Sequence, residues 1–385
     1  MERRKFIEIM GAGAIACTAF PCVALAAAGS YNNLLVLIEL KGANDGLNTV
    51  IPFANPAYYK LRPRLAIAPD QIVELASGTG LHPQLAMLKP LWDRNELAIV
   101  QGVGYPDQNL SHFRSIEIWD TASKSDEYLH DGWLTRAFAA SSPPRKFFAD
   151  GAVVGSSDMG PLSGIGVRSI ALADTGIFLR QAHLSRPSGD ARNAALQRIL
   201  KLESEIQQAA GKLNAEYIFK TNFPPGPFGN AVRTAAELIA SNAGIAVIRL
   251  SLNGFDTHSN QTATHANLLH ELGGGIVALR AALIELKRWH STLVMTYAEF
   301  GRRPQENQSG GTDHGTANAH FVVGGKVKGG LYGQTPQLDC LDGNGNLPYA
   351  VDFRSLYATV LERWWGVDSI AVLGRKLPTL DLVKT

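Results

Sequence analysis

The chain has 385 residues, of which 45% are hydrophobic and 18% are charged, so it has enough apolar material for one large α/β domain or two smaller ones. This composition does not favour disorder. The formal net charge is +2 and no long basic or acidic block occurs, so nucleic acid and an anionic membrane are not expected partners.

Residues 1–28 have the pattern of an export signal. Arg3 and Arg4 precede an aromatic residue, Phe6, and a weakly apolar Gly/Ala-rich run follows. This pattern resembles a twin-arginine signal, and an ordinary secretory signal or an uncleaved anchor is the alternative. We therefore expect the twin-arginine translocation machinery as a partner, a periplasmic or secreted location, and no stable membrane insertion after cleavage.

The mature chain is expected to begin near residue 29. Removing residues 1–28 takes away three basic and two acidic residues and leaves a formal net charge of +1. Cys340 is then the only cysteine, which excludes an intrachain disulfide. Stability must come from packing of the core.

Apolar runs typical of buried strands alternate with segments of helical spacing along the chain. The predicted strands are 34–40, 97–100, 245–250 and 292–297, with shorter pieces at 152–154 and 169–172. The predicted helices are 84–92, one beginning near Ser111, and those at about 190–217, 229–241 and 264–289. The alternation predicts a single large α/β domain, residues 29–385, with a mostly parallel sheet flanked by helices. The polar, Gly-rich stretch 303–312 is predicted to be a loop.

Carboxylates and imidazoles follow several of these strands. In a parallel sheet the carboxyl ends of the strands meet at one edge, so such side chains are expected to lie close together. Mixed carboxylate and imidazole ligands favour zinc, with manganese, iron, magnesium or calcium as alternatives. The candidate metal ligands are Asp45, Asp256, His258, Glu299, Asp313 and His314, with His320 as an outer candidate.

Three further residues are candidates for catalysis. Ser111 lies at an expected helix start, where it is either a nucleophile activated by a metal or a plain N-cap. His112 is a ligand, an acid or base, or part of the helix surface. Arg302 either clamps an anionic substrate or pairs with a carboxylate.

A second serine has a local pattern of its own. Ser141-Ser142-Pro143-Pro144-Arg145 matches the core by which sulfatase serines are converted to formylglycine, but the flanking residues lack the rest of that signature. A sulfatase that uses Ser141 is therefore the weakest of the functional hypotheses.

Five segments in a fixed order carry a resemblance to a known family. They are Lys41–Gly46, Leu110–Phe113, Gly254–His258, Glu299–Arg302 and Gly311–Gly315. With them the chain resembles the bacterial family known as domain of unknown function 1501, which is related to the alkaline phosphatase and sulfatase superfamily. The resemblance implies an alkaline-phosphatase-like fold with two metals and a serine, threonine or formylglycine nucleophile.

Carried onto this sequence, the resemblance implies a role for each matching position. Asp256, His258 and His314 would hold the first metal, and Asp45 would hold the second beside the nucleophile Ser111. Two departures concern this assignment. Asp256 and His258 have one residue between them where the superfamily has three, and Phe300 stands where a second-metal histidine is expected, which leaves Glu299 alone.

These observations predict an exported metal-dependent hydrolase that acts on a small anionic substrate, a phosphate or sulfate ester. The alternative is a noncatalytic secreted metal-binding or assembly partner with a degenerate site. Retained Ser111 and His314 favour the enzyme, and Phe300 favours the alternative.

Overall fold

The computed structural model describes residues 29–76, 78–172 and 217–384. The predicted export signal, residues 1–28, lies outside the described residues, as does nearly all of the predicted helix at about 190–217.

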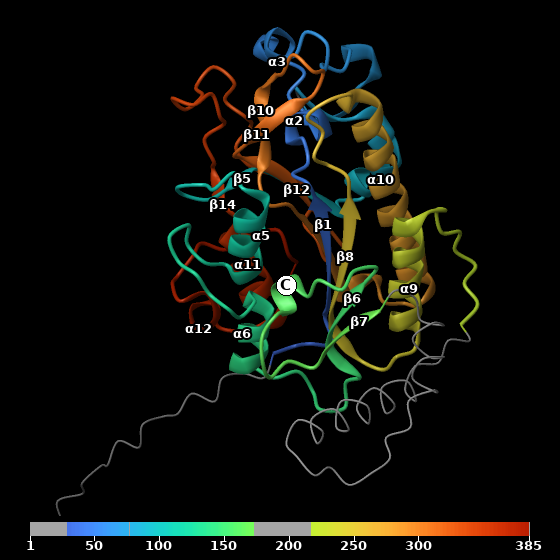
Figure 1. Ribbon diagram of the computed structural model, residues 1–385. Helices are drawn as coiled ribbons and strands as arrows, with labels where there is room; N and C mark the ends of the chain where they lie inside the picture. Colours follow the sequence, from blue (N-terminus) through green and yellow to red (C-terminus); the bar gives the residue numbers. More distant parts are fainter. Residues whose placement is uncertain (1–28, 77, 173–216, 385) are drawn as a thin grey trace, which may run out of the picture.

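Within the described residues, a nine-stranded sheet runs through the middle of the molecule (Figure 1). The strand order is β13-β5-β12-β9-β1-β8-β6-β7, with β14 beside β5. The strands are β1 (Leu34–Lys41), β5 (Leu97–Gly104), β6 (Ala149–Val154), β7 (Ser169–Leu172), β8 (Ile245–Asn253), β9 (Thr292–Tyr297), β12 (Asn318–Val323), β13 (Gly330–Gly333) and β14 (Val351–Asp352).

Helices cover both faces of this sheet, so its central strands are buried on both sides (Figure 1). Val36 and Ile38 of β1 face one core, whereas Leu35 and Leu37 face the other. The first core is covered by α9 (Pro227–Ala240) and α10 (Gln261–Glu285). The second is covered by α5 (His112–Thr121), α6 (Trp133–Ala140), α11 (Phe353–Thr359) and α12 (Ser369–Leu373). The predicted α/β class, with helices flanking the sheet, is confirmed.

Helix α10 is the one described helix whose length and composition would suit a membrane span. It packs against α9 and the 3₁₀ helix η2 (Pro83–Leu88), and 56% of its most apolar window is buried. Its apolar surface is therefore explained by burial against the sheet and its neighbours.

Shorter elements complete the described chain. A small sheet has the order β2-β4-β3. Its strands and the remaining helical elements are β2 (Val50–Ile51), β3 (Val73–Ala76), β4 (Thr79–Leu81), α2 (Gly46–Thr49), α3 (Pro56–Leu61), α4 (Lys89–Asp93), the 3₁₀ helices η1 (Pro69–Gln71), η3 (Gly160–Leu162) and η4 (Trp289–Ser291), and the π-helical turn η5 (Val360–Trp365).

The direction of the strands brings the predicted site residues to one edge. β1 pairs in parallel with β8 and β9, and β12 is antiparallel to both β9 and β5. Strands β1, β5, β8 and β9 therefore end at the same edge, and β12 begins there. The segment that precedes β12 is delivered to the edge where the other strands finish.

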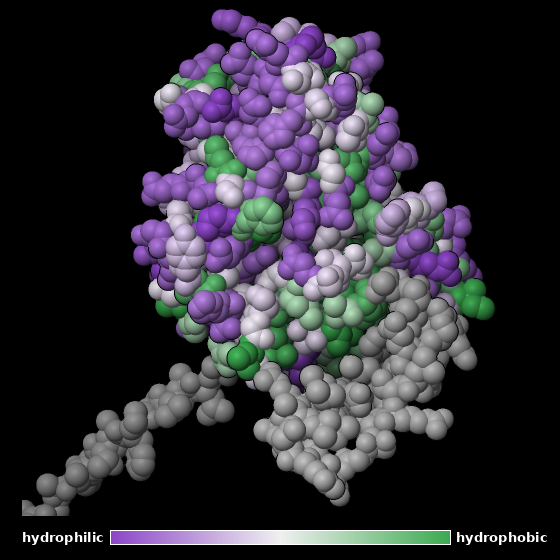
Figure 2. Space-filling model, viewed as in Figure 1, coloured by the Kyte–Doolittle hydropathy of each residue, from purple (hydrophilic) through white to green (hydrophobic). Residues whose placement is uncertain are grey.

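That preceding segment is a hairpin of β10 (Gly301–Glu306) and β11 (Thr312–Gly315). The expectation of a loop over 303–312 was wrong for 303–306, which belong to β10, and for 312, which begins β11. Asp313 and His314 also lie on β11 rather than in a loop. The polar sequence of β10 lacks the alternation of a half-buried strand, so the pattern did not predict a strand there. The segment is extended because it pairs with β11 and buries Arg302. Figure 2 shows a mostly hydrophilic surface over this upper part of the molecule, whereas hydrophobic residues gather lower down, near β6 and β7.

Candidate metal centre

Three histidines and one aspartate converge at the carboxyl edge of the sheet. The Nε2 atom of His314 lies 3.0 Å from Nε2 of His112 and 3.0 Å from Nε2 of His258. Asp256 Oδ1 lies 3.1 Å from Nε2 of His258 and 3.5 Å from Nε2 of His314, and Oδ2 lies 3.4 Å from Nε2 of His112. These four side chains form the His₃Asp cluster.

Three members of the His₃Asp cluster, His112, Asp256 and His314, have ligand atoms that all lie within 4.8 Å of one another, and His258 adds a nitrogen 3.0 Å from His314 Nε2. Ligand atoms about 2.05 Å from a tetrahedral ion lie about 3.3 Å from one another, and the separations given above run from 3.0 to 3.5 Å. Nitrogen lone pairs do not approach one another this closely unless a proton or a cation lies between them. The cluster therefore has the geometry and the donor set of a metal centre.

The outer nitrogen of each histidine ring faces an acceptor. Nδ1 lies 2.7 Å from Glu299 Oε1 in His112, 2.8 Å from the Leu110 carbonyl oxygen in His314, and 3.5 Å from Asp313 Oδ1 in His258. These acceptors place the ring proton on Nδ1 and turn the Nε2 lone pair towards the centre of the cluster. This is the arrangement of metal-ligating histidines, whose second nitrogen donates to a carboxylate or carbonyl.

The four side chains come from three segments at this edge. Asp256 and His258 follow β8, His112 opens α5 after β5, and His314 lies on β11 just before β12. The tight turn after β1 packs against the loop that follows β8. Gly42 in this turn has φ +106°, and a Cβ there would lie 2.5 Å from the backbone nitrogen of Asp256. Only glycine allows this close approach.

Glu299 lies behind the cluster and orients one of its ligands. The residue is buried, and its Oε1 accepts hydrogen bonds from the Gly42 backbone N–H at 3.0 Å and from His112. The hydrogen bond to Glu299 raises the pKa of His112. Glu299, expected to be a metal ligand, therefore contacts His112 on the side away from the other ligands.

Arg302 differs from the expectation that it clamps a substrate. Its side chain is fully buried, and its guanidinium donates to Asp256 Oδ1 at 2.7 Å. The other N–H groups donate to the carbonyl oxygens of Gly42, Ala43, Phe255 and Thr312. Burial works to raise the pKa of Asp256, but Arg302 outweighs it and the pKa is lowered. Arg302 thus holds Asp256 ionised and in place, and has no face free for an anion.

Asp45 also differs from its expected role as a ligand of a second metal. It is buried, caps α2 through the backbone N–H groups of Leu47 and Asn48, and forms an ion pair with Arg62 at 2.6 Å. Gln261 donates to its second oxygen as well. The Arg62 guanidinium therefore supplies the positive charge that the prediction assigned to a metal. No sequence signal pointed to Arg62, because it lies 17 residues from Asp45 without a recognisable motif.

His320 lies away from the His₃Asp cluster, whereas Phe300 packs against it. His320 lies in the core on β12, 5.4 Å from the Trp119 ring, and neither ring nitrogen has a hydrogen-bond partner among the described residues. Burial lowers its pKa to about 3. The structure therefore does not bring it to the cluster. Phe300 packs 4.9 Å from the His112 ring and 4.7 Å from the His314 ring, where it forms an apolar wall.

The two candidate serines lie at opposite edges of the sheet. Ser111 is exposed at the N-cap of α5, next to His112, and its hydroxyl makes no capping hydrogen bond. Ser141 follows α6, and its hydroxyl accepts from the Gly29 backbone N–H at 3.0 Å. Gly29 precedes β1, so Ser141 lies where the strands begin. Only Ser111 is beside the His₃Asp cluster.

Comparison with known proteins places this chain in a family. The family described as "Protein of unknown function (DUF1501)" matches residues 98–375. The chain belongs to the DUF1501 family. Among curated proteins, no relative matches.

Solved structures with a similar course of the chain are distant in sequence. The periplasmic domain of EcEptC from Escherichia coli, in complex with Zn, is 9% identical, with 76% of this chain and 72% of that chain covered and a TM-score of 0.37. The PsFucS1 sulfatase from Pseudoalteromonas sp. is 10% identical (91% and 70% covered; TM-score 0.42). The alkaline phosphatase from the Antarctic bacterium TAB5 is 11% identical (78% and 94% covered; TM-score 0.34). At these scores the similarities carry no inference about the site.

Proposed function

We propose that this DUF1501 chain is an exported hydrolase of phosphate or sulfate esters that works with one metal ion, with zinc as the first choice. The observation that carries the proposal is that Nε2 of His112, Nε2 of His258 and Oδ1 of Asp256 each lie within 3.5 Å of His314 Nε2, with every Nδ1 facing an acceptor. Three imidazoles and one carboxylate suit zinc better than magnesium or calcium, which prefer oxygen ligands alone.

A bound metal ion would polarise an ester oxygen and lower the pKa of a hydroxyl group beside it. The chain supplies the remaining parts. The exposed Ser111 hydroxyl is the proposed nucleophile, and the N-terminus of α5 favours an anionic group through its free backbone N–H groups. Because Arg302 is occupied by Asp256, binding of the anion rests on the metal and on this helix terminus.

The proposal names one metal rather than two. Asp45, expected to hold the second, is neutralised by Arg62, and Phe300 stands where the family resemblance implies a second-metal histidine. The same two observations favour a second candidate, a secreted metal-binding protein without ester hydrolysis.

Metal analysis of the purified protein tests the proposal first. We expect about one tightly bound zinc per chain, and its loss in His112→Ala, Asp256→Ala and His314→Ala. A screen of phosphate monoesters, phosphate diesters and sulfate esters should then detect turnover that Ser111→Ala abolishes. Full activity in Ser111→Ala would leave a metal-activated water as the nucleophile. One bound metal without turnover of any ester would select the noncatalytic candidate, and absence of bound metal would reject both.

Export is part of the proposal and has its own test. Replacing Arg3 and Arg4 with lysine should keep the protein in the cytoplasm, whereas the unaltered chain should accumulate in the periplasm or medium. Export of the double-lysine variant at the normal rate would contradict the twin-arginine route.

A further inference from the structure

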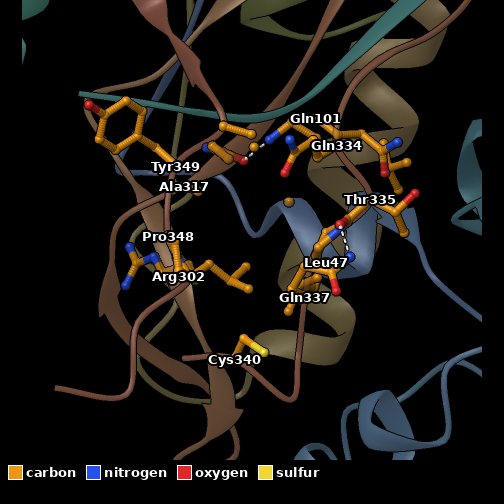
Figure 3. A pocket seen from close by; sticks show the side chains of 18 residues that line it. Leu47, Gln101, Arg302, Ala317, Gln334, Thr335, Gln337, Cys340, Pro348 and Tyr349 are labelled. Atoms are coloured by element: carbon orange, nitrogen blue, oxygen red, sulfur yellow. Dashed lines mark hydrogen bonds between the residues drawn. The ribbon is translucent and has the colours of Figure 1, made fainter. Parts of the chain in front are cut away.

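A cavity separate from the His₃Asp cluster lies between α2, β5 and the segment 334–350 (Figure 3). Its volume is about 140 Å³, and none of the four cluster residues lines it. For comparison, an apolar protein cavity of about 150 Å³ holds a benzene molecule. The space is therefore large enough for one small ring.

The amide of Gln101 is the polar feature of this cavity. Gln101 is 3% exposed and lines the cavity, and no described residue forms a hydrogen bond with its side chain. The second buried amide of the lining, Asn318, is satisfied, because it donates to the Phe300 carbonyl and accepts from the Ala319 N–H. The Gln101 amide atoms are not among the described polar atoms that are sealed from solvent without a partner, so water in the cavity can pair with them until a ligand replaces it. Gln101 therefore presents one free acceptor and two free donors to whatever fills the cavity.

The remaining walls indicate an uncharged, largely apolar occupant. Leu47, Val50 and Leu347 contribute aliphatic surface. Arg302 is the one charged residue in the described lining, and its guanidinium is turned away to its carbonyl and Asp256 partners (Figure 3). An ionic ligand would find no counter-charge and would lose its hydration.

The cavity is reachable from solvent. The exposed residues Gln334, Thr335 and Gln337 form part of its wall, and the exposed Cys340 lies on the same segment. A small molecule can enter along this segment without disturbing the central sheet. Cys340 also provides a natural chemical reporter of occupancy.

We propose that this cavity is a binding site for a small uncharged ring compound that carries a carboxamide. The ring contacts Leu47, Val50 and Leu347. The carboxamide forms two hydrogen bonds with the Gln101 amide, in which each NH₂ group donates to the carbonyl oxygen of the other. This site contains none of the four residues of the His₃Asp cluster and does not rest on ester hydrolysis, so its test does not require an active enzyme.

Benzamide and toluene are the matched probes, because they share a ring and differ in the carboxamide. Calorimetry on the full chain should give tighter binding for benzamide than for toluene. In Gln101→Leu, which keeps side-chain bulk and removes both hydrogen bonds, benzamide should bind about tenfold more weakly while toluene binds at least as well. The exposed Gln71→Leu is the control and should bind both probes as the unaltered chain does.

A second measurement does not depend on the variant. Alkylation of Cys340 by iodoacetamide, followed by peptide mass spectrometry, should slow at least threefold in saturating benzamide. Equal benzamide affinity in the unaltered and Gln101→Leu proteins would overturn the role of Gln101. No binding of either probe at millimolar concentration, together with unchanged Cys340 alkylation, would overturn the site itself.

Discussion

Nδ1 of His112 lies 2.7 Å from Oε1 of Glu299, which is itself fixed by the Gly42 backbone N–H. The carboxylate therefore acts on the metal centre through an imidazole and not by direct ligation. The contact also joins the first residue of α5 to the turn that follows β9.

This relationship predicts the effect of Glu299→Gln. The amide oxygen can still accept from Gly42 and His112, but the negative charge that supports the imidazole is lost. Metal affinity should fall about 10- to 100-fold, as for other outer-shell partners of ligating histidines. Competitive titration with a zinc chelator measures the change. Glu306→Gln, which affects a carboxylate paired with Arg64, is the control and should leave affinity unaltered.

Asp45→Asn and Asp256→Asn distinguish the structural assignment from the one based on sequence. Asp45 faces Arg62 and Gln261, so Asp45→Asn should destabilise the fold yet keep about one metal per folded chain. Breaking a buried ion pair costs about 3–5 kcal/mol, which urea unfolding would show. Asp256→Asn should instead lose metal, and because Asp256 is 46% exposed where it pairs with Arg302, the apoprotein should lose less stability than Asp45→Asn does. Loss of metal in a folded Asp45→Asn variant would restore Asp45 as a ligand.

Gly42→Ala should disturb the metal centre, because Gly42 packs against the backbone of Asp256. A Cβ at this position meets the Asp256 nitrogen at 2.5 Å, and φ is +106°, so both the contact and the backbone are strained. We expect a loss of at least about 2 kcal/mol in unfolding free energy together with weaker metal binding. Gly374 also has positive φ but open space around it. Gly374→Ala should cost about 1 kcal/mol and leave metal binding intact.

The burial of His320 predicts part of the pH dependence of the unfolding free energy. Burial lowers its pKa to about 3, whereas an unfolded histidine titrates near about 6.5. Between these values the unfolded chain holds one more proton, so stability falls as the pH falls, by up to about 1.4 kcal/mol per pH unit. We therefore expect the unfolding free energy, measured with urea between pH 4.5 and 6.5, to depend less steeply on pH in His320→Leu than in the unaltered chain. The difference in slope should correspond to about one proton. The same slope in His320→Leu and in the unaltered chain would contradict the prediction. His270 is exposed, so His270→Leu is the control and should have the same slope as the unaltered chain.

The sequence by itself determined the α/β class, because continuous apolar runs such as 34–40 and 245–250 have no stable place except a strand covered on both faces. The strand-end pattern predicted that the candidate ligands would lie at one edge of the sheet, and the family resemblance implied that Asp256, His258 and His314 form one site. The export signal and the start of the mature chain near residue 29 remain predictions.

Only the tertiary structure decided which polar residues converge on the His₃Asp cluster and which lie behind it. Asp45, Glu299 and Arg302 follow strands just as Asp256 does, and local pattern cannot tell them apart. Their roles depend on partners far away in the chain: Arg62 neutralises Asp45, Asp256 occupies Arg302, and His112 separates Glu299 from the other ligands. Such pairings are set by packing between elements, and the free energy of burying a charge depends on the neighbour that packing supplies.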